Sequence, residues 1–139
     1  MRKLDQRGVA ALEFCIIATP LFTLMFVIFD LGRYAITVQS LQMLANAEAR
    51  AIMLNCYTAN AVVKASPSGC TTAYLSAAQK QAVAPLLYAG GLMPTVRIAA
   101  AANGASPLTV TVSQTGFNML VPVWGTALNA PSVSTSIPF

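Results

Sequence analysis

The chain is unusually apolar: of its 139 residues 56% are hydrophobic and only 9% are charged, and its mean hydropathy is +0.65. Ordinary soluble domains carry about 25% charged residues, and disordered chains are poor in apolar residues, so both classes are excluded. The sequence contains no histidine and only four acidic residues. These counts exclude histidine catalysis, histidine-containing zinc sites and most paired-carboxylate mechanisms. We therefore expect no enzymatic activity, no cofactor, no metal and no small-molecule substrate.

The net charge of +4 is spread thinly along the chain. Arg2, Lys3 and Arg7 lie in the first seven residues, whereas only three basic residues follow Arg50. Nucleic-acid-binding proteins cluster their basic residues on one face. The sequence therefore predicts no nucleic-acid partner.

Residues 9–29 form the only segment long and apolar enough to cross a bilayer. Seventeen of these 21 residues are apolar, and a helix of that length spans roughly 30 Å, the hydrocarbon thickness. Basic residues precede the segment and Asp30 follows it, which places residues 1–8 in the cytoplasm by the positive-inside rule. The run is longer than a signal-peptide core and lacks its small-residue cleavage site. We expect a single retained anchor, with a kink rather than an end near Pro20.

Glu13 is the most informative residue of this segment, because a carboxylate at mid-bilayer costs about 2.5–3.5 kcal/mol. It lies near the cytoplasmic edge, where the cost is lower. One interpretation is that its side chain simply extends to the interface. The other is that it meets a partner charge inside an assembly. Cys15, two residues further on, is expected to behave as a small buried hydrophobic residue.

The residues around Glu13 favour the second interpretation. The stretch RGVAALEF, from Arg7 to Phe14, places Gly8 at the membrane boundary and a Glu-Phe pair five and six residues beyond it. This resembles the processing site of type IV pilin precursors, and more closely the TadE-like pseudopilins of tight-adherence (Tad/Flp) pilus systems. The stretch ATPL around Pro20 and the sequence FDLGR of residues 29–33 are similar to that family's mid-helix proline and polar exit from the membrane.

The resemblance implies a minor pilin that a prepilin peptidase cuts between Gly8 and Val9, with Phe14 in the recognition motif. Cutting creates an α-amino group at the membrane edge, and pairing of this amine with Glu13 of a neighbouring chain would favour registered assembly. Implied partners are other pilin subunits, the inner-membrane assembly platform and the bilayer. The implied role is surface attachment in pilus, biofilm or secretion systems. The alternative is a permanently anchored single-pass envelope protein with an outer partner-binding domain.

Beyond the membrane the helical pattern continues, and we expect one helix over residues 12–54. Its upper part, residues 30–56, carries an apolar stripe with three- and four-residue spacing, broken only by Glu48. Asp30 and Arg33 are three residues apart, so they can form an ion pair on one face. This helix is expected to pack on an extracytoplasmic domain of residues 57–139.

That outer domain begins with Cys56 and Cys70, which flank a Pro/Ser/Gly-containing loop. On the oxidising side of the membrane they are expected to form a disulfide, although two free thiols are the alternative. Thr71 or Thr72 is expected to cap a second helix that ends near Tyr88, before Gly90 and Gly91, or earlier if Pro85 shortens it.

The rest of the domain has the period-two pattern of strands. Residues 96–99 and 108–113 predict a hairpin around Asn103-Gly104, and residues 132–137 predict a last strand. Between them lies an apolar loop, in which Phe117, Met119 and Trp124 either fill the core or mark an interaction patch. The expected fold class is α+β and pilin-like: a long N-terminal helix on a small domain with a second helix and an antiparallel sheet.

Overall fold

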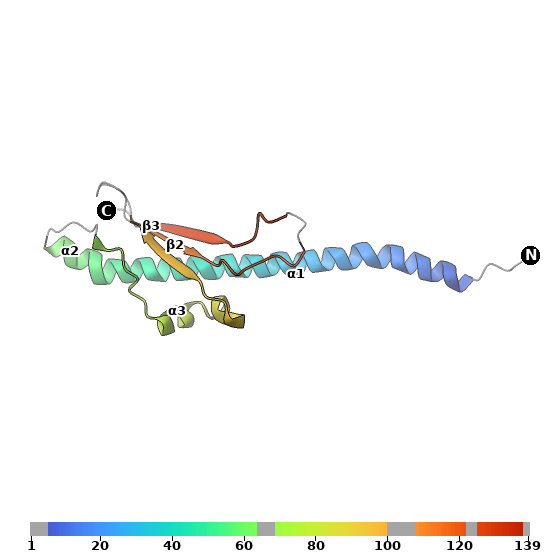
Figure 1. The fold of residues 1–139 in the computed structure, drawn as a ribbon, viewed down its shortest axis with the longest axis horizontal. Coiled ribbons are helices and arrows are strands. Elements are labelled where there is room, and N and C mark those ends of the chain that lie inside the picture. Colours follow the sequence, from blue (N-terminus) through green and yellow to red (C-terminus); the bar gives the residue numbers. More distant parts are fainter. Residues whose placement is uncertain (1–5, 64–68, 100–107, 122–124, 138–139) are drawn as a thin grey trace, which may run out of the picture.

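The described part of the chain consists of one long helix and a small domain (Figure 1). The domain packs on the C-terminal half of the helix, and no described element covers the N-terminal half, which is called here the bare half. The computed structural model describes residues 6–63, 69–99, 108–121 and 125–137. The helix α1 (Gln6–Ile52) contains 47 residues, which corresponds to about 70 Å. It continues through Pro20, and the π-helical turn η1 (Met53–Tyr57) and α2 (Thr58–Val62) extend it.

The two halves of α1 differ in what covers them. The large apolar side chains between residues 9 and 29 are exposed except for the half-buried Val27, whereas the apolar stripe further along the helix is buried. That stripe consists of Leu41, Leu44, Ala45, Ala49 and Ile52. The predicted long helix with a bare lower part and a packed upper part is therefore confirmed.

A three-stranded antiparallel sheet covers the upper half of α1. Its strands are β1 (Thr95–Ala99), β2 (Leu108–Ser113) and β3 (Ser132–Ile137), in the order β1-β2-β3. Val112 lies opposite Val96 on one side and Val133 on the other. Alternate residues of β2 are buried against α1 because successive strand side chains point to opposite faces. The predicted strands and the α+β fold are confirmed.

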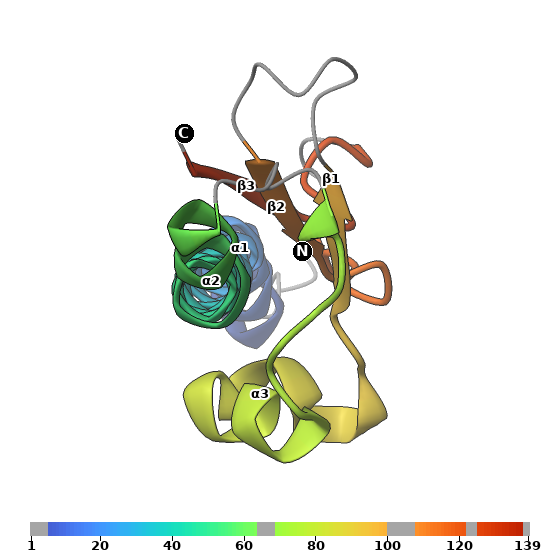
Figure 2. The same ribbon diagram turned by 90° about the vertical axis from the view of Figure 1, so that its left-hand side faces the viewer.

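A second layer of short helices lies on another side of α1 from the sheet, as the end-on view shows (Figure 2). It contains α3 (Ala77–Val83) and the 3-10 helix η3 (Pro85–Gly91). Buried Ala84 and Leu87 join this layer to the common core.

The predicted cap of the second helix is wrong, and the helix has the shorter of its two expected extents. Ser76, not Thr71 or Thr72, begins α3: its hydroxyl accepts from the Gln79 amide, and the Gln79 side chain accepts from the Ser76 amide. This reciprocal pair satisfies two amides that have no partner within the helix. Pro85 ends the α-helix because it has no N–H to donate. Gly91, with φ +77°, closes η3 in a conformation that favours glycine.

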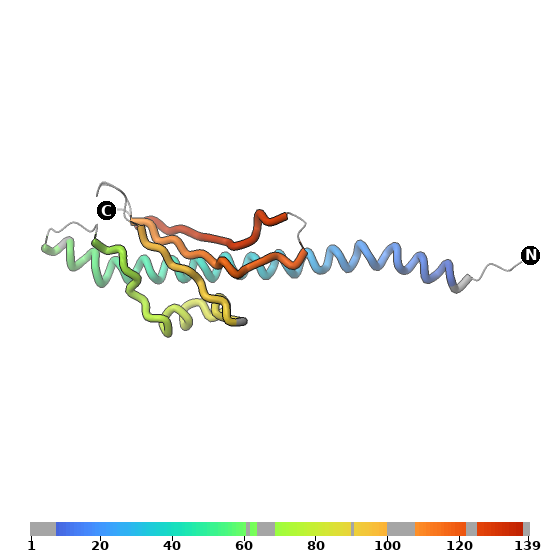
Figure 3. Tube along the Cα trace, viewed as in Figure 1, coloured from blue at the N-terminus to red at the C-terminus, as the bar shows by residue number. Residues whose placement is uncertain are grey.

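The apolar segment after β2 returns to α1 at the point where the bare half begins (Figure 3). Phe117 is buried in this segment, which confirms its role in packing, while Met119 is half-buried. Trp124 and the expected turn at Asn103-Gly104 lie outside the described residues, as do residues 1–5 of the expected leader.

Candidate functional site

The residues of the expected processing motif lie on the first turns of α1 and face outwards. Gly8, Val9, Glu13 and Phe14 are all exposed. A Cβ built on Gly8 would meet no other atom within 4 Å. The structure thus presents this segment to the surroundings of the helix rather than to the chain's own core.

Glu13 is an isolated charge on this surface. Within the described part of the chain its carboxylate has no hydrogen-bond or ion-pair partner, and its neighbours are exposed apolar side chains such as Leu12 and Ile16. It lies four residues beyond Val9, a rise of about 6 Å along the helix. A partner for this carboxylate must therefore come from outside the described part of the chain.

Asp30 is the opposite case, because its side chain is 2% exposed. Its Oδ2 accepts hydrogen bonds from the amides of Leu120 at 2.7 Å and Val121 at 3.0 Å. The Arg33 Nη2 lies 3.9 Å from Oδ1, so the Asp30–Arg33 contact is a loose one. The two backbone amides, which sequence reasoning did not identify, are the closer partners of Asp30.

Arg33 reinforces the same attachment. Its Nη2 donates to the carbonyl oxygen of Asn118 at 2.5 Å, and its guanidinium lies 4.8 Å from the centre of the Phe117 ring. The Tyr34 ring lies 6.1 Å from the same phenyl ring. Together these contacts hold residues 117–121, called here the basal loop, against the helix just above the bare half.

Glu48 anchors the domain at its other end. Its side chain is fully buried, and Oε1 accepts from the amides of Tyr74 and Leu75 at 2.5 and 3.3 Å. The Lys80 Nζ lies 3.9 Å from Oε2. Burial, and then the negative charge of Glu48, raise the pKa of Tyr88 above its ordinary 10.0. The signal available in the sequence was an acid placed within the buried stripe of the helix.

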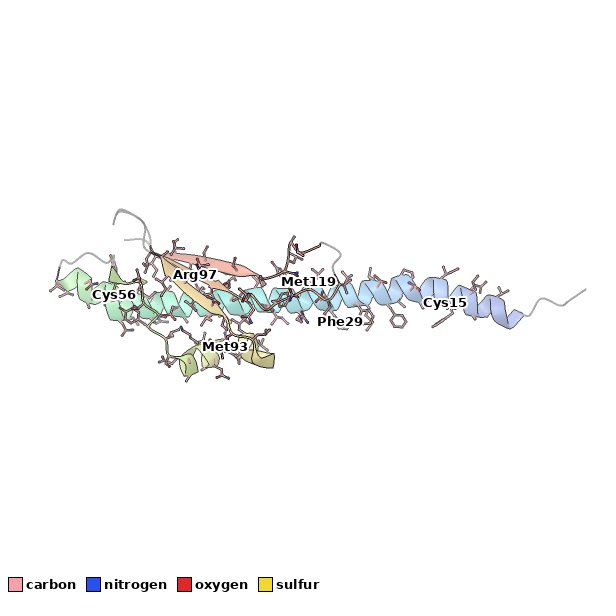
Figure 4. The ribbon with its side chains drawn as sticks, viewed as in Figure 1. Cys15, Phe29, Cys56, Met93, Arg97 and Met119 are labelled. Atoms are coloured by element: carbon pink, nitrogen blue, oxygen red, sulfur yellow. A yellow bond between two sulfur atoms is a disulfide. The ribbon has the colours of Figure 1, made fainter. Side chains whose placement is uncertain are left out.

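The cysteines of the two ends of the long helix also differ (Figure 4). Cys56 and Cys70 form a disulfide with a Cα–Cα distance of 5.8 Å, and it ties the segment before α3 to the end of the long helix. Cys15 is a free cysteine and is exposed. No described element packs on that part of α1, so burial of Cys15 within a membrane stays a prediction.

The bare half of the helix meets the requirements of a membrane span. The helix from Gly8 to Asn60 contains an 18-residue window with a mean hydropathy of 2.2, and none of that window is buried. A core helix of a soluble protein would be covered by other elements. The structure therefore supports membrane anchoring through a single N-terminal helix.

Comparison with protein families finds a match in the N-terminal part of the chain. Residues 8–50, about a third of the chain, match the family described as TadE-like protein. Neither a search of curated proteins nor a search of solved structures finds a match. The matched residues include Gly8, Glu13, the exposed apolar helix and both buried acids of its upper half. Over this N-terminal helix the chain is similar to TadE-like proteins.

Proposed function

We propose that the chain is a minor pilin that a prepilin peptidase cuts between Gly8 and Val9 and that enters, or initiates, a tight-adherence pilus. The observation that carries this proposal is the unpartnered, exposed Glu13 on an otherwise apolar helix surface. The match to TadE-like proteins supports it, since the match begins at Gly8 and includes Glu13.

Electrostatics give Glu13 its role in assembly. An unpaired carboxylate in hydrocarbon is penalised, and a nearby positive charge at low dielectric relieves that penalty. Cleavage before Val9 supplies such a charge, because a new α-amino group is protonated near neutral pH. When this amine pairs with Glu13 of a neighbouring subunit, chains in the correct axial register are favoured over chains that diffuse separately.

The proposed topology follows the charge distribution of the chain. The basic leader is cytoplasmic, the bare half of α1 spans the inner membrane, and the domain lies in the periplasm before assembly. The prepilin peptidase and the assembly platform would act on the exposed start of α1, and other pilin subunits would cover its apolar surface. After assembly the same domain would be carried on an extracellular fibre that attaches cells to surfaces.

Intact mass and N-terminal sequencing of the protein from membranes and from sheared surface material test the processing step. We expect a chain that begins at Val9 and a Gly8→Ala variant that remains uncut. Gly32→Ala is the matched control, because Gly32 is also a helical glycine whose added Cβ would meet nothing within 4 Å. A native chain that retains its leader in cells with an active prepilin peptidase would contradict the proposal and favour a permanently anchored envelope protein.

A second experiment isolates the charge of Glu13. We expect Glu13→Leu to insert into the membrane, to be cut, and to be lost from sheared pili. Thr23→Leu is the control, since Thr23 is a polar residue of the same exposed segment whose hydroxyl bonds only to its own helix, at the Thr19 carbonyl. Pili that contain Glu13→Leu at the level of the Thr23→Leu control would refute the register role.

A further inference from the structure

The face of the sheet that points away from α1 is covered with hydroxyl groups. Successive strand residues point to opposite faces, and the apolar residues of the strands point towards α1, where they join the core or pack against it. The helices lie on that same side of the sheet (Figure 2). The outward residues are called here the hydroxyl face, and seven of these nine carry a hydroxyl: Thr95, Thr109, Thr111, Ser113, Ser132, Ser134 and Ser136, with Arg97 and Ala99 as the other two.

The strand register places these groups in a regular grid around one cation. Arg97 on β1 lies opposite Thr111 on β2, and Thr111 lies opposite Ser134 on β3. Neighbouring strands are about 4.8 Å apart, so this row of three side chains spans about 10 Å. Thr109 and Ser113 lie on either side of Thr111 along β2, each roughly 6.7 Å away. A ligand on this face therefore meets one guanidinium with hydroxyls beside it in both directions.

The groups of the hydroxyl face are free to bind a ligand. Within the described residues neither the Arg97 guanidinium nor any of the seven hydroxyls has a side-chain partner. Thr135, on the opposite face of β3, is by contrast bonded to Asn46 of α1. Arg97 and the outward serines of β3 are exposed, and Thr111 is half-buried between its two neighbouring strands.

The charge distribution of the chain favours an anionic ligand. Of the four acidic residues, Asp5 and Glu13 precede the domain in the sequence, and Asp30 and Glu48 are buried. The described surface of the domain therefore exposes no carboxylate side chain. Arg97 is the single charge of the hydroxyl face, and no like-charged ligand group is balanced there, so the local potential is positive.

The position of the hydroxyl face excludes a phospholipid as this anion. Thr135, next to Ser134, is bonded to Asn46, which lies 17 residues beyond Phe29 on the continuous helix. That separation is a rise of about 25 Å along α1, whereas the headgroup layer is about 5–8 Å thick on each side of a bilayer. Figure 4 likewise shows Arg97 beside the upper half of α1, away from the bare half.

The side chains of the hydroxyl face indicate a carbohydrate. The face has no aromatic residue and no leucine, isoleucine or methionine. Single-stranded nucleic acids bind through aromatic stacking and clustered basic residues, and protein partners are anchored mainly by aromatic and other large side chains. Serine and threonine hydroxyls both donate and accept hydrogen bonds, as the hydroxyls of a sugar do.

We propose that the hydroxyl face binds an acidic polysaccharide, a chain of sugars that carry carboxylates. Arg97 pairs with one carboxylate, for which the planar guanidinium offers two parallel donors. Thr111 and Ser134 exchange hydrogen bonds with the sugar hydroxyls beside that carboxylate. The inference uses the membrane-spanning part of the proposed function only to exclude lipid, and it does not depend on processing or assembly.

Binding of polygalacturonate, a polymer of a carboxylated sugar, to the uncut full chain in zwitterionic nanodiscs tests the inference. Methyl-esterified polygalacturonate keeps the sugar hydroxyls without the charges, and polyphosphate supplies charge without sugar. The variants are Arg97→Gln and Thr111→Val, with Ser134→Ala as a further variant should Thr111→Val fail to fold. Arg50→Gln and Thr58→Val are the matched controls, because these exposed residues lie on α1 and α2 rather than on the sheet.

We expect polygalacturonate to bind and its methyl ester to bind at least tenfold more weakly. Arg97→Gln should raise the half-saturating concentration of polygalacturonate about tenfold, because a charge-assisted hydrogen bond is lost. Thr111→Val should raise it about threefold, the effect of one neutral hydrogen bond. The two control variants should bind like the native chain.

Four results would overturn the inference. The first is no binding of polygalacturonate, and the second is an equal loss in Arg97→Gln and Arg50→Gln, which would mean that the polymer meets only the net charge of the domain. The third is polyphosphate binding as tight as that of polygalacturonate, with Thr111→Val affecting neither. The fourth is self-association that Arg97→Gln abolishes and polygalacturonate does not compete with, which would assign the face to a second copy. All four would leave processing and assembly untouched, because the chain is tested uncut.

Discussion

The two halves of α1 form one continuous helix, yet their acidic side chains have opposite environments. In the lower half Glu13 is exposed among apolar side chains and has no partner in the described part of the chain. In the upper half Asp30 and Glu48 are buried, and each accepts hydrogen bonds from two backbone amides of the domain. The upper half thus makes its contacts within the chain. The lower half is left to make its contacts with the membrane and, as proposed, with other subunits.

This difference shows how the domain is attached. The apolar stripe of the helix provides non-directional burial against the sheet, while the two carboxylates fix specific loops at the two ends of the contact. Charged acceptors form stronger hydrogen bonds than neutral ones. The upper acids therefore fix loops of the domain to the helix, whereas the lower acid makes no such contact within the described residues and is left, as proposed, for contacts between chains.

Removal of Glu48 should have the largest effect on the isolated protein. Glu48→Leu leaves the amides of Tyr74 and Leu75 without an acceptor and Lys80 without its partner. We expect the free energy of unfolding of the domain to fall by about 3–5 kcal/mol, measured by chemical denaturation of the full chain in detergent. Glu48→Gln, which keeps an acceptor oxygen, should lose less. Equal stability of Glu48→Leu and the native chain would show that Glu48 is not an anchor.

Loss of the disulfide should come next. Replacement of both Cys56 and Cys70 by serine opens a loop whose ends are 14 residues apart. The chain-entropy model gives a loss of about 3 kcal/mol in the free energy of unfolding for such a loop. The same denaturation experiment measures this loss. Cys15→Ser, which changes the exposed free cysteine of the lower half, is the control and should leave the domain's stability unchanged. A similar loss in both variants would contradict the division between the halves.

Weakening of Asp30 should have a smaller and local effect. Asp30→Asn keeps an acceptor but removes the negative charge, which should cost about 1–2 kcal/mol. Hydrogen exchange should accelerate at the amides of Leu120 and Val121, which donate hydrogen bonds to the carboxylate. The amides of Tyr74 and Leu75, held by Glu48, are the internal reference. Unchanged exchange at the basal loop would show that the Phe117 packing and the Arg33–Asn118 hydrogen bond hold it without the Asp30 charge.

Replacement of Glu13 should have the smallest effect on the single chain. Because its carboxylate makes no contact within the described residues, we expect Glu13→Leu to change the domain's unfolding free energy by less than about 0.5 kcal/mol. The measurement is the same detergent denaturation that reveals the Glu48 effect. A destabilisation comparable to that of Glu48→Leu would mean that Glu13 has a partner within its own chain, and the contrast between the halves would fail.

Local periodicity determined most of the architecture. The apolar residues 9–29 predict a membrane span, because the run is long enough to cross the hydrocarbon layer. The alternation of β2, with Leu108, Val110 and Val112 on one face, predicts both the strand and its buried side. These features depend on residues close together in the sequence, so they could be read without the fold.

Tertiary structure decided the rest, because it depends on groups far apart in the chain. The start of α3 is an exception, because Ser76 and the glutamine three residues later that completes the capping pair form a local signal in the sequence. The sequence placed Glu48 within the apolar stripe and Asp30 beside Arg33, but it did not identify the main partners of these two acids. Their partners are backbone amides 26 to 91 residues away, and an amide carries no sequence signature. The sequence by itself therefore determined which half of the helix is bare, and only the folded domain decided which acids are buried and what they hold.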